Sequence, residues 1–368
     1  MRKKGYYLYT EKCGSSGVNN KIRMQISTFS EKVDIKGVQI ENCPRNLLKR
    51  IWGLFLWGSF ARDYEKALRE IKSPDFLYIR RWYIDKRQLE FLKAIKEKYP
   101  LCKIIVEIPT YPYFKEFCSN VYNILALFKE IMYMGKNKLY IDRFVTYSND
   151  EKIFGIPTIR TMNGIDTKSI TSSFNDTKYT GKEIHLVAVA LFARHHGYER
   201  IIKGLYEYYM SPRKCTIFFH VVGTGSELPK YEKMVRKCHL EKYVLFYGER
   251  SGEALDAIYC KADIGVAALG VYKDGLSKLS TLKAREYMAK GLPVILGAED
   301  DLFTQCKYGL FFPNDRTPIK MERVVNFACD LFEGKDRRVL ASEIRNYVEK
   351  NADNCVTLKP IIDYIYSD

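Results

Sequence analysis

The sequence has no apolar run long enough to cross a membrane as a helix. Its longest unbroken apolar stretch lies around Ile51 to Trp57, far short of the ~20 residues that a spanning helix needs. Residues Met1 to Thr10 pass from a short basic start into a strand-like apolar segment, without the long apolar core and small-residue cleavage site of a secretion signal. We therefore expect a cytoplasmic protein.

Paired cysteines and a concentrated basic arm are also absent. The ten cysteines include no Cys-x-x-Cys pair and no Cys/His cluster, so we expect reduced, mostly buried thiols. The formal charge of +16 indicates an acidic partner. Because the basic residues are interleaved with acids and no nucleic-acid motif is present, a phosphate-bearing substrate or an anionic membrane face is favoured over nucleic acid.

What is present is a repeated alternation of short apolar runs with segments of helical period. A chain of 368 residues favours two domains, and strands that alternate with helices are typical of parallel, doubly wound α/β sheets. A Ser/Thr/Asn/Lys-rich stretch, Thr167 to Lys182, separates two such units. The expected strands span residues 6–9, 38–40, 76–79, 103–108, 185–192, 216–222, 244–247, 264–268 and 293–296.

In doubly wound sheets, ligands bind beyond the carboxyl ends of the strands, where helix N-termini favour anions. The loop after strand 185–192 carries Arg194, His196 and Arg200, a basic turn suited to a phosphate. A solvated helix residue without a ligand is an equally good interpretation of Arg200. The adjacent His195 and His196 have no acidic companion, which disfavours a metal site.

The loop after strand 216–222 contains two glycines, Gly223 and Gly225. It lacks the complete dinucleotide fingerprint, so nicotinamide binding is not supported. A small-residue turn beneath a nucleotide base and an ordinary strand-to-helix turn both remain open.

A third loop opens the helix expected over residues 281–290. Ser280 and Thr281 are good N-cap residues. The backbone amides from Ser280 to Leu282, together with Lys278 or Lys283, would cradle a pyrophosphate. The sequence therefore predicts an anion site at the start of this helix.

Glu286, one turn into the same helix, would accept hydrogen bonds from ribose hydroxyls. It also lies three residues after Lys283 and four before Lys290, which is the spacing of an exposed helical ion pair. Both interpretations remain open for this carboxylate.

Seven segments of the chain stand out together: Ser16-Gly17-Val18, Tyr78-Ile79-Arg80, Glu107 to Tyr113, Asn163-Gly164-Ile165-Asp166, His196 to Arg200, Leu282 to Tyr287 and Gly291-Leu292-Pro293. In their order and spacing, these segments resemble retaining glycosyltransferases of the GT-B type, the group 1, glycosyltransferase family 4-like enzymes of capsular polysaccharide biosynthesis. The resemblance implies two doubly wound Rossmann-like domains that face a central cleft. It implies an acceptor-binding domain over residues 1–175, a nucleotide-sugar domain over 176–345, and a C-terminal helix, 346–368, that packs back on the first domain.

Within this resemblance, Glu286 corresponds to the second glutamate of the family's Glu-x7-Glu pair, which implies a ribose-binding role. Lys278 stands where the first glutamate, a residue that commonly touches the sugar, is expected. Leu191 and His196 occupy the positions nearest the family's phosphate-binding Arg and Lys. The basic side chains expected to take over are Arg194, Arg200 and Lys283.

The resemblance also implies the chemistry. The acceptor hydroxyl attacks on the face from which the nucleotide diphosphate departs, and the leaving phosphate takes the proton, so no metal or other cofactor is expected. The Asp-x-Asp metal motif of the other glycosyltransferase fold is missing, and Glu299-Asp300-Asp301 is the nearest approach to it. Glu107 would orient the acceptor or act as a base, or would only be a hydrogen-bonded turn carboxylate. Ser16 and Gly17 would lie on the acceptor side.

The expected function is transfer of a hexose from a nucleotide-diphosphate sugar, with UDP as the expected carrier, to a saccharide or lipid-linked saccharide acceptor. A nucleotide-sugar epimerase and a non-catalytic nucleotide-sugar-binding protein are the alternatives. Two segments with aromatic and basic residues would contact an anionic inner membrane face. These are residues 49–57 and residues 117–133, the latter followed by Lys136 and Lys138, although amphipathic core helices look similar.

Overall fold

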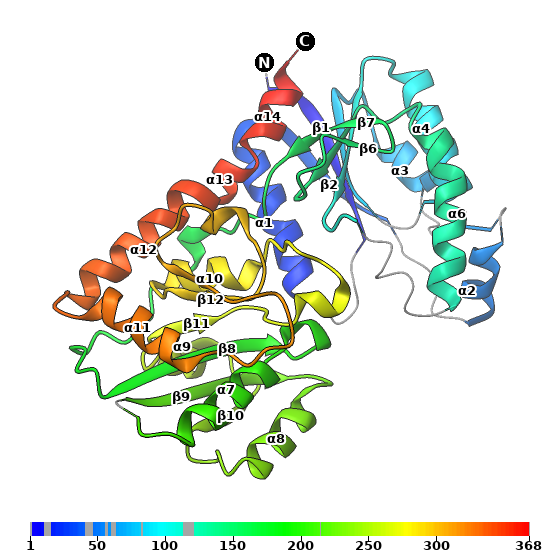
Figure 1. Ribbon diagram of the computed structural model, residues 1–368. Coiled ribbons are helices and arrows are strands. Elements are labelled where there is room, and N and C mark those ends of the chain that lie inside the picture. Colours follow the sequence, from blue (N-terminus) through cyan, green and yellow to red (C-terminus); the bar gives the residue numbers. More distant parts are fainter. Residues whose placement is uncertain are drawn as a thin grey trace. The chain divides into compact units, whose positions relative to one another are not determined.

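The computed structural model describes residues 2–10, 16–40, 47–55, 58–59, 64–81, 84–112, 121–213 and 215–367. The chain divides into two compact units (Figure 1). Unit 1 comprises Met1–Met162 and Asn354–Asp368, and unit 2 comprises Asn163–Asp353. Among the described residues, no helix combines the length and the apolar character that crossing a bilayer demands.

Unit 1 is built on a sheet with the strand order β2-β1-β3-β4-β5-β7-β6, in which only the β6–β7 pair is antiparallel. The inner strands are nearly continuous apolar runs, because a parallel sheet is covered by helices on both faces. The strands are β1 (Lys4–Tyr9), β2 (Asp34–Gln39), β3 (Phe76–Arg80), β4 (Lys103–Ile108), β5 (Arg143–Thr146), β6 (Lys152–Ile153) and β7 (Ile156–Arg160).

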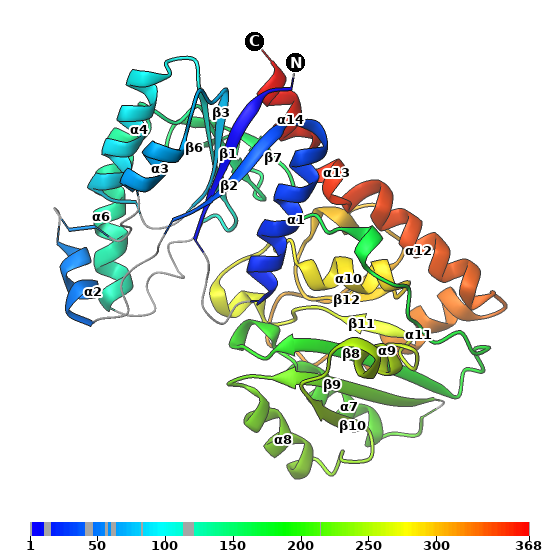
Figure 2. The ribbon, with the colours of Figure 1, turned by 180° about the vertical axis from the view of Figure 1, so that it is seen from behind.

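Two apolar cores lie on the two faces of this sheet. One core packs β-strand side chains against α3, α4 and α6, and the other packs them against α1 and α14. In the second core, Leu358, Ile361 and Ile365 share a cluster with buried aromatic residues of the sheet and of α1, so the C-terminal helix packs back on the first domain as expected (Figure 2). Its expected start at residue 346 is wrong, because residues 346–352 end a helix of unit 2 and the chain returns to unit 1 only at Asn354. The helices of unit 1 are α1 (Ser16–Lys32), α2 (Leu47–Leu54), α3 (Tyr64–Glu70), α4 (Lys86–Lys98), α6 (Val121–Asn137), α13 (Asn354–Thr357) and α14 (Lys359–Tyr366).

Unit 2 contains an all-parallel sheet with the order β10-β9-β8-β11-β12-β13. Both units are thus doubly wound α/β sheets, as the alternation of strands and helices predicts. The strands are β8 (Glu183–Leu191), β9 (Thr216–Thr224), β10 (Val244–Gly248), β11 (Ile264–Val266), β12 (Val294–Leu296) and β13 (Gly309–Phe311). The helices are α7 (Glu199–Tyr209), α8 (Leu228–Lys237), α9 (Gly252–Tyr259), α10 (Leu282–Lys290), α11 (Met321–Phe332) and α12 (Arg337–Ala352), and the short 3-10 turns are η1 (Thr167–Ser169), η2 (Arg194–His196), η3 (Val271–Asp274) and η4 (Asp301–Phe303).

The chain enters unit 2 at Asn163, earlier than the boundary expected between residues 175 and 176. The reason is hydrogen bonding that sequence periodicity does not reveal. The amide of Ile165 donates to the carbonyl of Ala352 at 3.0 Å, and Thr167 Oγ1 donates to Asp353 at 2.7 Å. The polar segment between the units is therefore pinned to unit 2 before the first strand of that unit begins.

Candidate functional site

The N-terminus of α10 forms as the sequence predicts. Thr281 is the N-cap, with an extended backbone and with its Oγ1 accepting a hydrogen bond from the amide of Ala284 at 3.3 Å. This bond satisfies one of the amides that a helix start leaves without an internal partner. The helix starts after β11 and the turn η3, which is the side of a doubly wound sheet where ligands bind.

Lys283 in the first turn of α10 contacts the histidine of η2. Its Nζ lies 3.0 Å from Nε2 of His196, whose side chain is only 5% exposed. Burial and then the charge of Lys283 lower the pKa of His196 to about 2, so the imidazole is neutral. The Nδ1 of His196 lies 2.9 Å from the amide nitrogen and 3.2 Å from the carbonyl oxygen of Ala193. The ring is thereby fixed, and it holds the Lys283 amine at the start of α10.

Burial lowers the pKa of Lys283 to about 8, and the nearby carboxylate of Glu286 partly opposes this shift. Partial desolvation by the surrounding protein raises the pKa of Glu286, and the charges of Lys283 and Lys290 oppose this shift. The Glu286 side chain is nevertheless exposed to solvent. Lys283 is therefore mostly charged at neutral pH, and its protonation is sensitive to mildly alkaline conditions.

Asp300 ties the start of α10 to the turn that follows β12. Its two carboxylate oxygens accept bonds from Arg285 at 2.7 and 2.8 Å, and both side chains of this ion pair are fully buried. The same carboxylate accepts from the amides of Leu302 and Thr281. The Thr281 amide is thus already bonded within the protein, and it is not one of the free amides expected for a pyrophosphate.

Lys278 is engaged by a neighbouring carboxylate. Its Nζ forms an ion pair with Asp301 at 2.6 Å, and the backbone beside it pairs with Glu299 through the bonds Leu279 N to Glu299 O and Glu299 N to Ser277 O. Two carboxylates of the Glu299-Asp300-Asp301 run are therefore neutralised by cations. In the part of the chain that the structure describes, no group of three His, Cys, Asp or Glu side chains is arranged to hold a metal ion.

Ser280 is held by the segment that enters unit 2. The amide of Asn163 donates to Ser280 Oγ at 2.9 Å, and Asn163 Nδ2 donates to the Ser280 carbonyl at 2.5 Å. Asn163 belongs to the Asn-Gly-Ile-Asp segment, so this segment shapes the loop before α10. Leu282, the first residue of α10, is half-buried.

The two arginines near η2 differ in their surroundings. Arg200 is 1% exposed and donates to the carbonyls of Thr317, Leu269 and Pro313 at 2.7, 2.6 and 2.8 Å. Its guanidinium therefore ties loops of unit 2 together, a geometry that disfavours the predicted role on a diphosphate. The Arg194 side chain is exposed.

Gly223 and Gly225 lie at the end of β9, where the backbone passes close to the end of β8. Both have positive φ values, 122° and 142°. A Cβ would lie 2.0 Å from the Ala190 carbonyl oxygen at Gly223, and 2.3 Å from the backbone of Phe192 at Gly225. Close strand packing accounts for both glycines, and the base-binding interpretation stays a prediction.

Glu107 of β4 is a fully buried hub of unit 1. It accepts bonds from Arg80 at 3.0 Å, Lys21 at 3.2 Å, Tyr147 at 2.5 Å and Tyr78 at 2.8 Å. Burial alone would raise its pKa, but the charges of Lys21 and Arg80 and the two hydroxyl bonds lower it to about 2. A carboxylate held in this way has little tendency to accept a proton, which disfavours the base role and favours a structural one.

The predicted acceptor contacts, Ser16 and Gly17, belong to the first turn of α1. The Ser16 side chain, the exposure of Gly17 and the loop residues 11–15 before them lie outside what the structure describes. The acceptor prediction therefore stays a prediction.

A buried ion pair near η2 went unrecognised in the sequence. Lys273 of η3 bonds to Glu199 at the start of α7, and its Nζ also donates to the Arg194 carbonyl at 3.0 Å. The pair holds η3 against η2, directly before the loop that leads to Lys278. Glu199 lies in the quoted basic segment, but nothing in its spacing predicts a partner more than seventy residues away.

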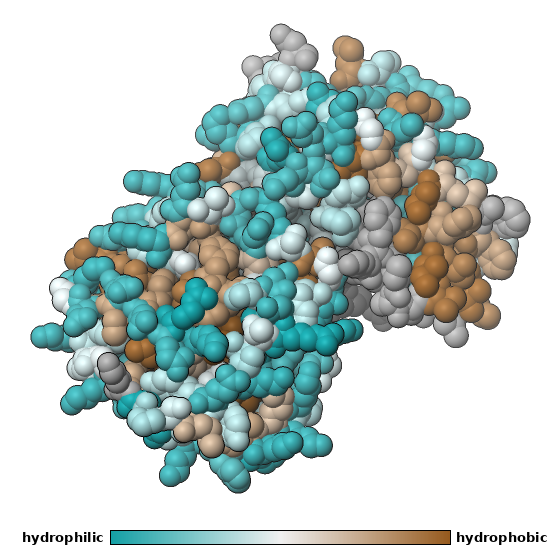
Figure 3. Space-filling view, viewed as in Figure 1, coloured by the Kyte–Doolittle hydropathy of each residue, from teal (hydrophilic) through white to brown (hydrophobic). Residues whose placement is uncertain are grey.

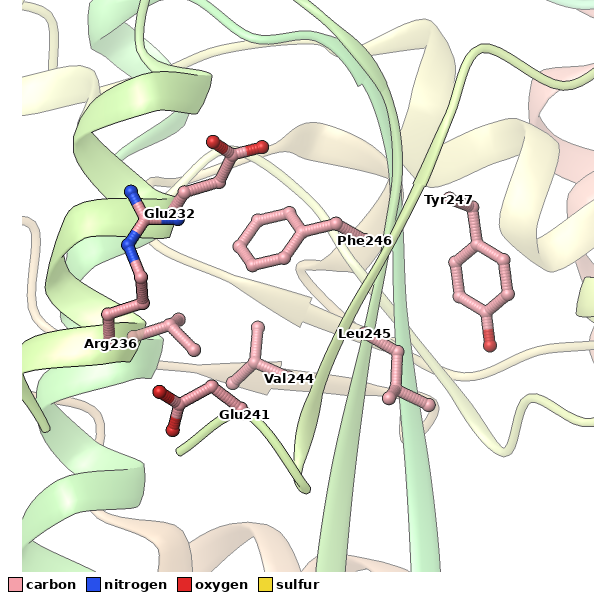
Figure 4. A pocket seen from close by; sticks show the side chains of 8 residues that line it. Glu232, Arg236, Glu241, Val244, Leu245, Phe246 and Tyr247 are labelled. Carbon is pink, nitrogen blue, oxygen red and sulfur yellow. The ribbon is translucent and has the colours of Figure 1, made fainter. Parts of the chain in front are cut away.

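Two pockets of unit 2 are lined by residues that do not belong to the predicted donor site. A pocket of about 510 Å³ lies between α8 and β10, with Glu232 and Arg236 on the helix and Phe246 on the strand (Figure 4). A second pocket of about 520 Å³ lies beside the start of α12 and includes Asp176 and Arg338, which are bonded to each other. Neither is lined by the α10 residues that would meet a diphosphate.

Comparison with known proteins identifies the domain that carries the α10 site. Residues 183–324 match the family model described as "Glycosyl transferases group 1". This range runs from β8 into α11, so it includes η2, η3 and the whole of α10. A search of curated protein sequences found no match.

Solved structures show the same architecture over nearly the whole chain. The HepE protein of Anabaena, solved with UDP and glucose, is 13% identical with a TM-score of 0.61, and the match covers 99% of both chains. Sucrose-phosphate synthase from Thermosynechococcus elongatus is 14% identical with a TM-score of 0.64, covering 99% of this chain and 98% of that one. The lipopolysaccharide outer core galactosyltransferase WaaB is 14% identical with a TM-score of 0.58, covering 99% of both. The chain therefore has the GT-B fold, and its residues 183–324 match the group 1 glycosyltransferase model.

Proposed function

We propose that this protein transfers a hexose from a UDP-sugar to a saccharide or lipid-linked saccharide, with retention of configuration, in the assembly of a surface or capsular polysaccharide. The proposed location is the cytoplasm, at the inner face of the membrane. The observation that carries the proposal is the Lys283 amine, fixed by His196 at the capped start of α10, inside the domain that matches group 1 glycosyltransferases. The choice of UDP rests on the Anabaena structures, which contain it.

In the proposed reaction the bond between the anomeric carbon and the diphosphate breaks while the acceptor oxygen bonds to the same carbon. The acceptor proton passes to the departing diphosphate, so no protein base is needed. Negative charge grows on the diphosphate, and preorganised positive charge stabilises such a transition state. Lys283 and the dipole of α10 supply that charge.

Glu286 is proposed to accept hydrogen bonds from the ribose. It lies on α10 three residues after Lys283, so the two side chains share one region of the helix surface. Solvent reaches the carboxylate, which leaves it accessible to a ligand. We propose no metal cofactor, because Asp300 and Asp301 are already paired with Arg285 and Lys278.

Ligand-induced stabilisation tests the donor assignment. The melting temperature of the full chain would be measured with UDP, GDP and ADP, each with and without EDTA. A ligand at about a hundred times its Kd adds about 2.7 kcal/mol of stability, so we expect a clear rise with UDP that EDTA does not remove. A rise with GDP alone would refute the uracil assignment, and a rise lost in EDTA would refute the metal-free donor site.

Turnover separates the enzyme from a binding protein. With UDP-glucose and UDP-galactose as donors and a saccharide acceptor, we expect release of UDP, with the anomeric configuration of the product read by NMR. Nucleotide binding without turnover of any UDP-sugar would favour the non-catalytic alternative, and exchange between the two sugars would favour an epimerase. An inverted product would refute retention.

A further inference from the structure

Two neighbouring helices of unit 1, α2 and α6, carry an unusual outer surface. They lie side by side in both views (Figures 1 and 2), and Lys129 of α6 joins them by donating to the carbonyls of Gly53 and Gly58 at 2.7 and 2.5 Å. Lys129 is buried, so this contact lies beneath the surface that the two helices present.

Helix α6 is apolar on its outer side as well as its inner side. Ala126 and Met134 are buried in the core of unit 1. A helix that covers a sheet in water ordinarily has a polar opposite face. Between Val121 and Met132 the exposed positions whose side chains are described recur at helical spacing over about 17 Å of helix, and they are all apolar: Val121, Ile124, Leu125, Phe128, Ile131 and Met132.

Helix α2 continues this surface. Its exposed apolar residues are spaced three, one and three positions apart, and so share one face: Leu48, Ile51, Trp52 and Phe55. The rings of Trp52 and Phe55 are in contact, with centroids 5.7 Å apart. Trp52 is 57% exposed and Phe128 is 63% exposed. These ten side chains are here called the apolar face, and Figure 3 shows brown residues gathered where Figure 1 draws α6.

The charges on these two helices favour an anionic occupant. The only acid of α6 is Glu130, which is buried and held by Arg81 through bonds of 2.6 and 2.7 Å, and α2 contains no acid. Lys136 and the following Lys138 are exposed at the end of α6, and α2 itself includes Lys49 and Arg50. The whole chain has a net charge of +16.

An apolar face of this extent marks an interaction surface. A helix pair with tryptophan and phenylalanine on its outer side, and with exposed lysines at the end of α6, resembles helices that lie in the interface plane of a membrane. Anionic lipid headgroups attract lysine and arginine close to such a surface. We propose that α2 and α6 dock this protein on an anionic lipid bilayer, with the apolar face inserted at the level of the headgroups.

This inference deepens the proposed function, since it names the surface that would bring the enzyme to a lipid-linked acceptor. The docking itself does not require the donor site, which lies in unit 2. Failure of one proposal therefore leaves the other standing.

Vesicle co-sedimentation of the full-length protein tests the proposal. We would compare vesicles of phosphatidylcholine alone with vesicles that also contain phosphatidylglycerol, and the double variant Trp52→Ser/Phe128→Ser with wild type. Because each removed side chain is worth about tenfold in partitioning, we expect about a hundredfold weaker binding to the anionic vesicles. The matched control is Met210→Ser/Val339→Ser, two exposed apolar residues of unit 2, which we expect to bind like wild type.

Further measurements on the same proteins check that the variants fold and distinguish membrane docking from self-association. Unchanged circular dichroism and unchanged stabilisation by UDP are expected in both double variants, because all four side chains are exposed. Binding that is absent from both vesicle types, or that is equal in wild type and the Trp52→Ser/Phe128→Ser variant, would overturn the proposal. A wild-type dimer in sedimentation equilibrium that this variant converts to a monomer would show instead that the apolar face binds a second copy of the chain.

Discussion

Replacing Glu107 by glutamine distinguishes a structural carboxylate from a catalytic one. The substitution leaves Lys21 and Arg80 beside a neutral side chain in the interior of unit 1. Removing one partner of a buried ion pair costs about 3–5 kcal/mol. The pKa of Glu107, about 2 against an ordinary 4.5, independently corresponds to about 3 kcal/mol of stabilisation at neutral pH. We therefore expect Glu107→Gln to lower the free energy of unfolding of unit 1 by about 3 kcal/mol.

Tryptophan fluorescence during urea unfolding measures this loss in the right unit. The three tryptophans, at positions 52, 57 and 82, all belong to unit 1. The matched control is Glu90→Gln, which removes an exposed i,i+4 pair with Lys86 and should cost less than about 0.5 kcal/mol.

The pH dependence of the same transition has a defined sign. Because the folded-state pKa of Glu107 is depressed, its stabilisation is complete above pH about 4.5 and is lost as the pH falls towards about 2. Wild type should lose this contribution over that range, whereas Glu107→Gln has none to lose. A Glu107→Gln protein as stable as Glu90→Gln, but inactive in sugar transfer, would refute the structural role and restore the catalytic one.

Three further predictions concern unit 2. Since burial lowers the pKa of Lys283 to about 8, UDP affinity measured by calorimetry should fall as the pH rises above 8, and Lys283→Arg should remove that fall; parallel curves for both would contradict it. Asp300→Asn leaves Arg285 buried without its countercharge and should cost about 3–5 kcal/mol, seen in urea unfolding followed by circular dichroism; a loss below about 1 kcal/mol would be incompatible with this role. Gly225→Ala places a Cβ 2.3 Å from backbone atoms at a φ of 142° and should lower the free energy of unfolding by about 2 kcal/mol or more in the same assay. The control Gly252→Ala, with positive φ but no atom within 4 Å of the added Cβ, should lower it by less. Equal losses of stability would show that the clash at Gly225 is relieved.

The fold was predictable because its signals are local. Nearly continuous apolar strands such as β4 and β8 alternate with helices, and Thr281 and Gly291 mark the two ends of α10. The expected strands did not include β5, β6, β7 and β13, which have only two to five residues each. So few residues show little periodicity of their own. The equally short β11 and β12 were predicted because each lies in a longer apolar run, whereas Arg143 in β5, Lys152 in β6 and Pro157 in β7 interrupt the apolar residues.

The partners of the site residues were not predictable in the same way. A basic residue near a helix start has the same sequence pattern in two different situations. It can bind a phosphate, as proposed for Lys283, or donate to backbone carbonyls, as found for Arg200. Those carbonyls come from loops about 70 to 120 residues away in the chain. Glu107 is a similar case, because its bonds come from α1, from β3 and from Tyr147 after β5. The spacing of residues along the sequence does not predict which distant segments supply these hydrogen-bond partners.

Titration of UDP into wild type, Lys283→Met and Lys350→Met by isothermal calorimetry tests the central claim most directly. Lys350 is an exposed lysine of α12 in the same unit, so its variant controls for the loss of one charge. A charge-assisted hydrogen bond is worth about 1.5–3 kcal/mol. The account predicts UDP binding that weakens about ten- to a hundredfold in Lys283→Met and stays unchanged in Lys350→Met. Equal affinity in Lys283→Met and wild type would contradict a donor site at the start of α10.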